Sequence, residues 1–384
     1  MSDWREAELN DVCYKITDGS HQSPKDCSGG FPMFSVKDME SYGFNYSKVK
    51  TISEDDFNFL VKQGCKPNIN DILIAKDGSV LKHIFRVKDE PNYVLLSSIA
   101  ILRPKTEIIN PDYLVYTIKS PVVNDLILSN FVSGSGVPRI VLKDFKKVQI
   151  SFPPLPEQKR IAEVLSSLDD KIDLLHRNNK TLEQLAETLF RKWFVEEAEE
   201  NKLSDEFNVT MGQSPPGDTY NEIGNGIIFY QGRTDFGFRF PKPRVYCTHP
   251  TRFAETFDTL MSVRAPVGDI NYAAEKCCIG RGVAAIRHKN KDIHHSYTYY
   301  LMKHLRSDFD VHEDTGTIFG SINKDELLNI KCPKLEINNI SYFNSSIGSL
   351  DDKLVSNCKQ IQQLETLRDT LLPKLMSGVV RVEN

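Results

Sequence analysis

One segment of this sequence occurs twice, and that repeat constrains the fold more than any other feature. Residues 167–171, Ser-Leu-Asp-Asp-Lys, return as residues 349–353, an offset of 349 − 167 = 182. At that offset, without gaps, residues 167–195 match residues 349–377 at eleven of 29 positions. Because the offset is about half of the 384 residues, the repeat predicts two copies of one large unit and not a solenoid of short repeats.

The composition is typical of globular proteins, with 40% hydrophobic and 26% charged residues. No apolar run approaches the ~20 residues of a membrane-spanning helix. The first residues lack the basic and apolar segments of a secretion signal, so we expect a cytoplasmic location. Eight scattered cysteines without a Cys-x-x-Cys pair predict reduced thiols, with neither disulfides nor a zinc site.

The repeats divide the sequence into parts. We predict four: a module over residues 1–152, a helical segment over 153–198, a second module over 199–332 and a second helical segment over 333–384. Pro153 and Pro333 mark the entries into the helical segments, because proline disfavours helix in the residue before it. The net charge of −4 does not indicate a nucleic-acid binder. Any DNA-binding surface therefore requires basic groups gathered on one face of a module.

Each helical segment carries an apolar stripe with 3-4 spacing, which is the heptad pattern of a coiled coil. The first stripe comprises Leu165, Leu168, Ile172, Leu175, Asn179, Leu182, Ala186, Leu189 and Trp193. The second comprises Ile347, Leu350, Leu354, Asn357, Ile361, Leu364, Arg368, Leu371 and Leu375. The simpler interpretation is an amphipathic helix packed on a domain, but two such helices in one chain favour an antiparallel intrachain coiled coil.

The asparagines predict the register of that coil. A buried Asn opposite Leu leaves its amide unsatisfied, at a cost of about 1–3 kcal/mol, whereas Asn opposite Asn restores a hydrogen bond. We therefore set Asn179 opposite Asn357. The other layers are then Leu165–Leu371, Ile172–Leu364, Leu175–Ile361, Leu182–Leu354, Ala186–Leu350 and Leu189–Ile347. Only Leu168–Arg368 is mixed, and there we expect the Arg head to reach solvent.

The two modules are expected to be diverged repeats of mixed α/β structure, which makes the whole chain α+β with a pseudo-two-fold repeat. Strands are expected over 71–78, 94–102, 258–265 and 282–286, and helices over 113–119 and 297–305. Turns are expected at 134–138 and 316–320, at matching places before each proline join.

Motifs of catalysis are absent from the sequence. No Asn/Asp-Pro-Pro-aromatic loop of an adenine-N6 methyltransferase occurs, and no GxxxxGK phosphate loop. We interpret the repeated Asp169-Asp170-Lys171 as a solvated or partner-facing charge cluster on a helix, because it lies inside a heptad pattern. His288, His294 and His295 have no carboxylate or thiol at fitting ligand spacing, so no metal site is predicted.

Candidate DNA contacts are basic and amide side chains beside glycines, aromatics or strand ends. Arg suits a guanine edge and Gln an adenine edge, although each residue singly can be an ordinary surface group. The candidates are Lys37, Lys76, Ser79, Lys82, His83 and Arg139 in the first module, and Gln231, Arg233, Arg264 and Arg281 in the second.

Three motifs carry a family resemblance. Residues 154–162, Pro-Leu-Pro-Glu-Gln-Lys-Arg-Ile-Ala, run into the repeated pentapeptide; Leu-Glu-Gln-Leu follows at 182–185, and Leu-Leu-Pro-Lys-Leu-Met-Ser-Gly at 371–378. Together they resemble the specificity (S) subunit of type I restriction-modification enzymes. The sequence departs from the family at residues 333–339, which lack the Pro-Leu-Pro-Glu-Gln sequence of the first helical segment. Whether the two helical segments offer partner subunits equivalent docking surfaces is therefore left open.

The resemblance implies two target-recognition domains separated by two long antiparallel helices, with each domain reading half of a split DNA sequence. It implies two modification (M) subunits docked on the helices, and it allows two restriction (R) subunits. S-adenosylmethionine, and ATP with Mg²⁺, would belong to those partners, with no cofactor in this chain. The helices would set the spacer, with half-sites about one DNA turn apart. The alternatives are a coiled-coil scaffold that binds only proteins, and a self-sufficient methyltransferase.

Overall fold

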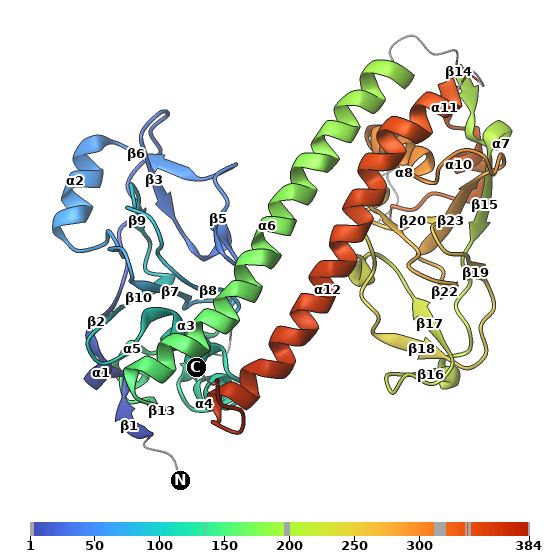
Figure 1. Cartoon of the computed structure of the whole chain (residues 1–384). Helices are drawn as coiled ribbons and strands as arrows, with labels where there is room; N and C mark the ends of the chain where they lie inside the picture. The colour runs from blue at the N-terminus through green and yellow to red at the C-terminus, as the bar shows by residue number, and fades with distance from the viewer. Residues whose placement is uncertain are drawn as a thin grey trace. The chain divides into compact units, whose positions relative to one another are not determined.

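The chain folds into two compact units, which are described separately. The computed structural model describes residues 4–134, 136–195, 200–310, 320–334, 336 and 339–382. Unit 1 comprises residues 1–174 and 362–384, and unit 2 comprises residues 175–361. Figure 1 shows the elements of the chain.

Unit 1 is built around a four-stranded antiparallel sheet in the order β2-β10-β7-β8, of Cys13–Asp18, Ile99–Pro104, Ile72–Ala75 and Ile84–Arg86. The central strand β7, Ile-Leu-Ile-Ala, is buried along its whole length, as expected of a strand covered on both faces. A second sheet has the order β6-β3-β9, of Lys50–Ile52, Phe31–Phe34 and Val94–Leu95, in which β3 and β9 are parallel. Short pairs are β1 (Arg5–Glu8) with β13 (Gln149–Phe152), β4 (Met39–Glu40) with β5 (Gly43–Phe44), and β11 (Val132–Ser133) with β12 (Arg139–Ile140).

The helices of unit 1 pack on these sheets. They are α1 (Leu9–Val12), α2 (Glu54–Lys62), α3 (Pro111–Lys119), α4 (Pro121–Asn130) and α5 (Leu142–Phe145). Asn110 begins α3: its side chain accepts a hydrogen bond from the Tyr113 N–H, and Pro111 occupies the first turn, where its missing N–H costs nothing.

Unit 2 repeats this topology. Its four-stranded sheet β15-β23-β20-β21 consists of Phe207–Met211, Val283–His288, Thr259–Ser262 and Ile270–Tyr272. Its second sheet, β16-β18-β17-β22-β19, consists of Tyr220–Asn221, Val245–Cys247, Ile227–Tyr230, Cys277–Ile279 and Phe253–Ala254, and again pairs two strands in parallel. A short pair joins β14 (Glu200–Lys202) to β24 (Lys331–Pro333). The helices are α7 (Leu203–Glu206), α8 (Ser296–His304), α9 (Arg306–Asp310), α10 (Lys324–Asn329) and α11 (Ile340–Phe343), and a π-helical turn follows at Asn344–Gly348.

The expected α+β class with two related modules is confirmed. The predicted strand over 94–102 is divided into β9 and β10, because Ile99 N donates to Leu96 O across a turn. The turn predicted at 316–320 lies outside the described residues apart from Gly320.

Two long helices complete the units: α6 (Leu155–Phe194) and α12 (Ser349–Met376) lie side by side in Figure 1. The two asparagines meet in unit 2, where the register analysis expects them: Asn357 Nδ2 donates to Asn179 Oδ1 at 2.9 Å. Both are buried. In the same unit Ala186 and Leu189 share a core with Leu350 and Ile347, as that register requires.

Two side chains depart from the predicted stripe. Trp193 is 38% exposed, whereas Phe190 and Phe194 are buried in the core of unit 2. A 3.6-residue helix drifts from a strict heptad, and here the module covers the face that carries the phenylalanines. Arg368 does not simply reach solvent, since its guanidinium donates to Asp169 Oδ1 at 2.8 Å.

No described helix is long and apolar enough to cross a membrane.

Candidate nucleic-acid interface

In unit 1 the candidate residues lie on three segments that hydrogen bonds tie together at the end of β7. Lys76 N donates to Ser98 O at 2.9 Å, Gly78 N to Pro138 O at 2.7 Å, and Ile140 N to Lys76 O at 3.0 Å. Val36 N also donates to Ser98 Oγ at 3.0 Å. The structure therefore gathers Lys37, Lys76, Ser79, Lys82, His83 and Arg139 around one turn.

These candidates differ in how available their side chains are. Lys37, Ser79, Lys82 and Arg139 are exposed. Lys76 is instead 7% exposed, and its ammonium pairs with Asp18 at 3.1 Å and Asp77 at 3.3 Å. It could contact a phosphate only by leaving two carboxylates, so its position indicates a role in holding the turn. Sequence reasoning missed this because Asp18, 58 residues earlier in the sequence, meets Lys76 only in the folded chain.

His83 is partly buried beside Lys82. Burial, and then the neighbouring Lys82 charge, lower the pKa of its imidazole below the usual value. Its Nδ1 is buried and has no hydrogen-bond partner among the residues that the structure describes. A neutral ring is thus favoured, which suits a hydrogen-bonding contact better than a phosphate contact.

In unit 2 the candidates again surround the ends of the central strands. Val263 N donates to Gly282 O at 3.0 Å, and Gly280 N donates to Tyr230 O at 2.8 Å. A Cβ on Gly282 would lie 2.5 Å from Gln231 O, so only glycine allows this approach of the two backbones. The exposed side chains of Gln231, Arg264 and Arg281 are thereby held on adjacent segments.

Arg233 is a different case. It ion-pairs with Asp269, and Arg306 pairs with the same carboxylate. Asp269 lies at the end of the β20–β21 turn, directly before β21, and its N–H donates to Ser262 Oγ at 2.9 Å. Arg233 therefore belongs to this surface with its charge partly balanced, whereas Arg264 has no ion pair among the described residues.

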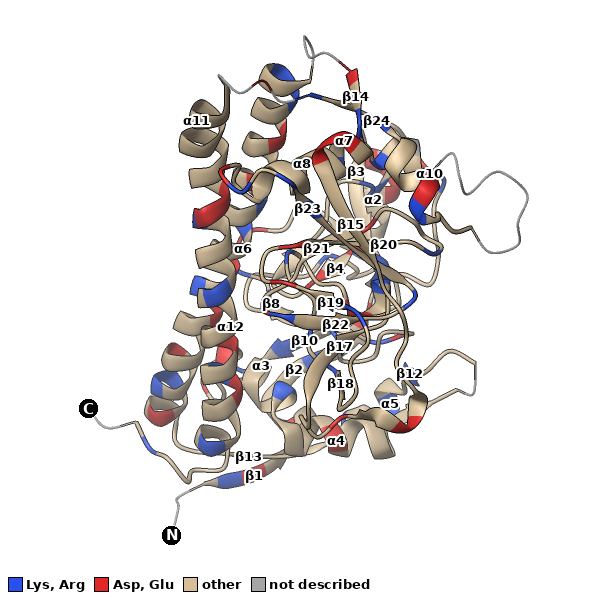
Figure 2. Cartoon of the chain, turned by 90° about the vertical axis from the view of Figure 1, so that its right-hand side faces the viewer, with Lys and Arg blue, Asp and Glu red and all other residues tan. Residues whose placement is uncertain are grey.

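The two clusters occupy equivalent places in the repeated topology. One surrounds the turn after β7 and the other the turn after β20, the corresponding strand in the four-stranded sheet. Figure 2 shows basic and acidic positions interspersed along the helices and the modules, in keeping with the net charge of −4. Neither module is basic over its whole length. Any contact with DNA phosphates would therefore depend on the basic side chains that lie around these two turns.

A second functional feature, which sequence reasoning misread, attaches each module to the long helices. Asp169 is 6% exposed and accepts hydrogen bonds from Tyr116 Oη at 2.9 Å, Tyr42 Oη at 3.1 Å and Arg368. The expectation of a solvated or partner-facing Asp169-Asp170-Lys171 cluster is wrong for Asp169. Burial, and then the Asp169 charge, raise the pKa of Tyr116 far above its usual value, so the phenol keeps the proton that it donates.

Unit 2 contains the corresponding anchor. Asp351 is fully buried and accepts hydrogen bonds from Tyr272 Oη at 2.9 Å, Tyr300 Oη at 3.1 Å and the Arg239 guanidinium. The sequence signal was present: α3 and α8 share the spacing Tyr-x-x-Tyr-x-x-Lys, at Tyr113, Tyr116 and Lys119 and at Tyr297, Tyr300 and Lys303.

The Gln of the Pro-Leu-Pro-Glu-Gln motif forms a second attachment in unit 1. Gln158 is 1% exposed; its Oε1 accepts from Asn110 N at 2.8 Å, and its Nε2 donates to Ile108 O at 3.1 Å. Its amide thus clamps the residues that lead into α3. Because one side chain makes both bonds, the motif fixes how α6 meets α3.

Unit 2 makes the same clamp with another residue. Asn344 Oδ1 accepts from His294 N at 3.0 Å, and its Nδ2 donates to Asp292 O at 2.7 Å, on the segment that leads into α8. Asn344 lies in the π-helical turn, one helical turn later than the place of Gln158 in the repeat. Unit 2 therefore lacks the Pro-Leu-Pro-Glu-Gln sequence, but Asn344 makes the hydrogen bonds that Gln158 makes in unit 1.

The comparisons with known proteins agree with this architecture. Residues 1–184 match the type I restriction modification DNA specificity domain. A Mycoplasma genitalium type I restriction-modification S subunit shares the fold, with a TM-score of 0.64 at 20% identity over 97% of this chain and 96% of that chain. Residues 1–184 thus match a DNA specificity domain, and the chain has the fold of that S subunit.

The relatives extend the match beyond the first module. A Methanocaldococcus jannaschii protein provisionally named as the type I restriction enzyme MjaX specificity subunit is 28% identical over 99% of this chain and 94% of its own length. The MjaIX specificity subunit of the same organism is 24% identical over 99% of this chain and 94% of its own. Over almost its whole length, the chain is therefore similar to specificity subunits of type I restriction-modification systems.

Proposed function

We propose that this chain is a non-catalytic subunit that reads a two-part DNA sequence and assembles modification subunits on its helices. The observation that carries the proposal is the duplication. Two units of one topology each present an exposed polar cluster at the same turn, and each is anchored to the long helices through a buried Asp.

The clusters around the turns after β7 and β20 would contact the DNA and recognise its sequence. In unit 2, Gln231, Arg264 and Arg281 supply side chains of the kinds that recognise adenine and guanine edges. In unit 1, the exposed Lys37, Lys82 and Arg139 supply charges for phosphates or a guanine edge. The clusters differ in residue type, so the two halves of the target would differ.

The helical repeat supports docking of two similar partners. Six of its eleven identical positions are exposed in both copies, where core packing cannot explain the identity. One of them, Asp170 and its equivalent Asp352, contacts the modules through Lys88 and His294. The other five form what we call the docking stripe: Ser167, Lys171, Leu185, Thr188 and Lys192 on α6, and Ser349, Lys353, Leu367, Thr370 and Lys374 on α12.

The stripe lies on the flank of the helices opposite the modules. Each of its residues directly precedes a position of the apolar seam, as Leu185 precedes Ala186. Asp169, Asp351 and Glu183 directly follow seam positions, and these are the side chains that bind the modules. Residues before and after a seam position flank it on opposite sides of the helix.

Each unit holds one complete set of the docking stripe, with parts from both helices. Unit 1 has Ser167 and Lys171 from α6 with Leu367, Thr370 and Lys374 from α12. Unit 2 has Leu185, Thr188 and Lys192 from α6 with Ser349 and Lys353 from α12. Two equivalent sets predict two modification subunits. S-adenosylmethionine would then be held by those subunits, and ATP with Mg²⁺ by restriction subunits that join them.

The docking is tested by charge substitution of the exposed leucines, which are 45% and 46% exposed. We expect the full chain to bind two modification subunits, Leu185→Asp or Leu367→Asp to bind one, and the double variant none. Burying the exposed half of such a Leu contributes about 0.7–1.4 kcal/mol, or roughly three- to tenfold in affinity, and an Asp in its place adds the cost of an unpaired charge at the interface. Gln184→Asp and Thr366→Asp, one residue away on each helix, are the matched controls. Light scattering of the purified complexes gives the stoichiometry; two bound subunits in every variant would refute the stripe.

The DNA reading is tested by sequencing the methylated bases of a host that expresses this chain with its modification subunit. We expect a two-part motif, and Arg264→Ala should relax only one half of it, at about 1–3 kcal/mol for that half-site. A complex that assembles but binds DNA without sequence preference would instead establish a protein-binding scaffold. Methyl transfer by the chain alone would establish a self-sufficient methyltransferase.

A further inference from the structure

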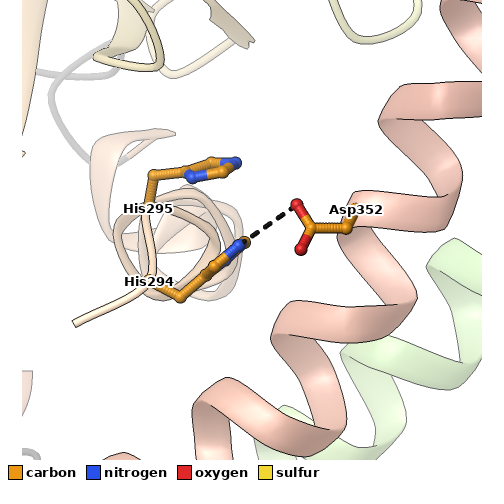
Figure 3. A group of neighbouring side chains, drawn as sticks. All are labelled: His294, His295 and Asp352. Carbon is orange, nitrogen blue, oxygen red and sulfur yellow. Dashed lines mark hydrogen bonds and ion pairs between the residues drawn. The ribbon is translucent and has the colours of Figure 1, made fainter. Parts of the chain in front are cut away.

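Three potential metal ligands meet in unit 2, from segments far apart in the sequence. His294 and His295 lie just before α8, and Asp352 lies on α12. His294 Nε2 is 3.3 Å from Asp352 Oδ1. One ligand atom from each of the three residues lies within 4.8 Å of the other two. Figure 3 shows His294 joined to the Asp352 side chain, with the His295 ring beside it.

The spacing of His294 and Asp352 fits one metal ion. Zinc binds imidazole nitrogen and carboxylate oxygen at about 2.0–2.2 Å in tetrahedral geometry, so two of its ligands lie about 3.3–3.5 Å apart. The observed 3.3 Å matches that edge. The third ligand needs only a small side-chain adjustment to come from 4.8 Å to the same spacing.

His295 places a second imidazole beside these two residues. Its Nε2 is buried, makes no hydrogen bond among the described residues and lies 3.8 Å from Asp351 Oδ2. Its ring stacks on Phe257 at 4.2 Å between centroids and meets the edge of Tyr272 at 5.0 Å, which fixes its orientation.

His294 is oriented by its other nitrogen. Its Nδ1 lies 2.7 Å from Ser296 Oγ and accepts a hydrogen bond from Ser296 N at 3.3 Å, which points Nε2 at Asp352. Asp352 is 65% exposed, so solvent can reach the site. The nearest buried cation, Arg239, is balanced by Asp351 and Glu183.

We propose that His294, His295 and Asp352 bind one divalent transition-metal ion, Zn²⁺ by preference, with solvent as the fourth ligand. Imidazole with carboxylate is a ligand set that suits zinc and its neighbours Co²⁺ and Ni²⁺. The ion would join the start of α8 to α12 and so reinforce the attachment of the second module to its helix.

Unit 1 offers an internal control, because its described residues contain no such group. Asn110 and Pro111, at the start of α3, occupy the places of the two histidines, and the equivalent carboxylate, Asp170, pairs with Lys88 at 2.5 Å. The prediction that no metal site exists rested on ligand spacing along the sequence. Its premise is wrong, because Asp352 reaches His294 across 58 residues of sequence.

The experiment uses the full chain, stripped of metal with a chelator and then titrated with Co²⁺ and Zn²⁺. We expect one equivalent to bind, with the visible absorption of tetrahedral Co²⁺, and Zn²⁺ to raise the thermal unfolding midpoint. Asp352→Asn and His294→Gln should weaken binding by tenfold or more and abolish the thermal shift. Asp170→Asn should bind as the unsubstituted chain does, and circular dichroism checks that each variant is folded.

Three outcomes would overturn the proposal. One is less than half an equivalent of metal bound by the unsubstituted chain. Another is equal affinity in the Asp352→Asn variant. The third is a near-ultraviolet thiolate band on Co²⁺ binding, which would assign the ion to cysteines instead.

Discussion

The anchor at Asp351 should be the most sensitive single position of unit 2. Asp351→Asn keeps the shape of the side chain but removes its charge. Arg239, whose side chain is fully buried, then retains only Glu183 at 3.3 Å as a carboxylate partner. Removing one member of a buried ion pair costs about 3–5 kcal/mol, because the remaining charge stays desolvated. We expect a loss of that size in the free energy of unfolding.

The equivalent substitution in unit 1 provides the comparison. Arg368 is 21% exposed and keeps Asp369 as a second carboxylate at 2.9 Å. Asp169→Asn should therefore cost only about 1.5–3 kcal/mol, the range of a hydrogen bond to a charged group. Two anchors with the same Asp and Tyr partners should thus differ, because one guanidinium reaches solvent and the other does not.

A compensating variant separates the ion pair from the packing. Asp351→Asn with Arg239→Met removes both charges, and replacement of a buried pair by apolar groups is often neutral or stabilising. The double variant should recover most of the loss. Urea unfolding with linear extrapolation measures each free energy, and limited proteolysis shows which unit opens. A double variant whose loss equals the sum of the single losses would refute the reasoning.

Three further sets of changes, two of substitutions and one insertion, test the helices and their attachments. Asn179→Leu should cost about 1–3 kcal/mol in urea unfolding, and adding Asn357→Leu should restore it, because the pair leaves no buried amide unpaired; losses that simply add would argue against the pairing. Gln158→Leu should cost about 1–3 kcal/mol and Asn344→Leu less, since Gln158 is the more buried clamp; equal losses would contradict this ranking. Inserting seven residues in both long helices adds ~10.5 Å to each, so the spacer of the methylated motif should lengthen by about 3 base pairs, and an unchanged motif would exclude the helices as its ruler.

The sequence alone determined the features that depend on local order and on repetition. The heptad spacing shows where the helices run, because a seam needs apolar residues on one face of a 3.6-residue helix. The single Asn in each stripe was enough to predict their register, since a buried amide requires a partner. The repeated pentapeptide and the Pro-Leu-Pro-Glu-Gln wording indicated the family. The central strands and helices α3 and α8 were also predicted from local apolar patterns.

The tertiary structure alone decided which charges are buried and which side chains meet. Asp169 and Asp170 are adjacent and identical, yet one is buried against Tyr116 and the other is exposed, because they lie on different faces of one helix. The sequence suggested Lys76 as a cation available to DNA, but in the fold its ammonium is ion-paired with Asp18 and Asp77. Asn344 makes in unit 2 the hydrogen bonds that Gln158 makes in unit 1, and a comparison of the two repeat sequences does not reveal this. Burial, ion pairing and ligand geometry depend on residues distant in sequence, and only the packing of helices on modules brings such residues together.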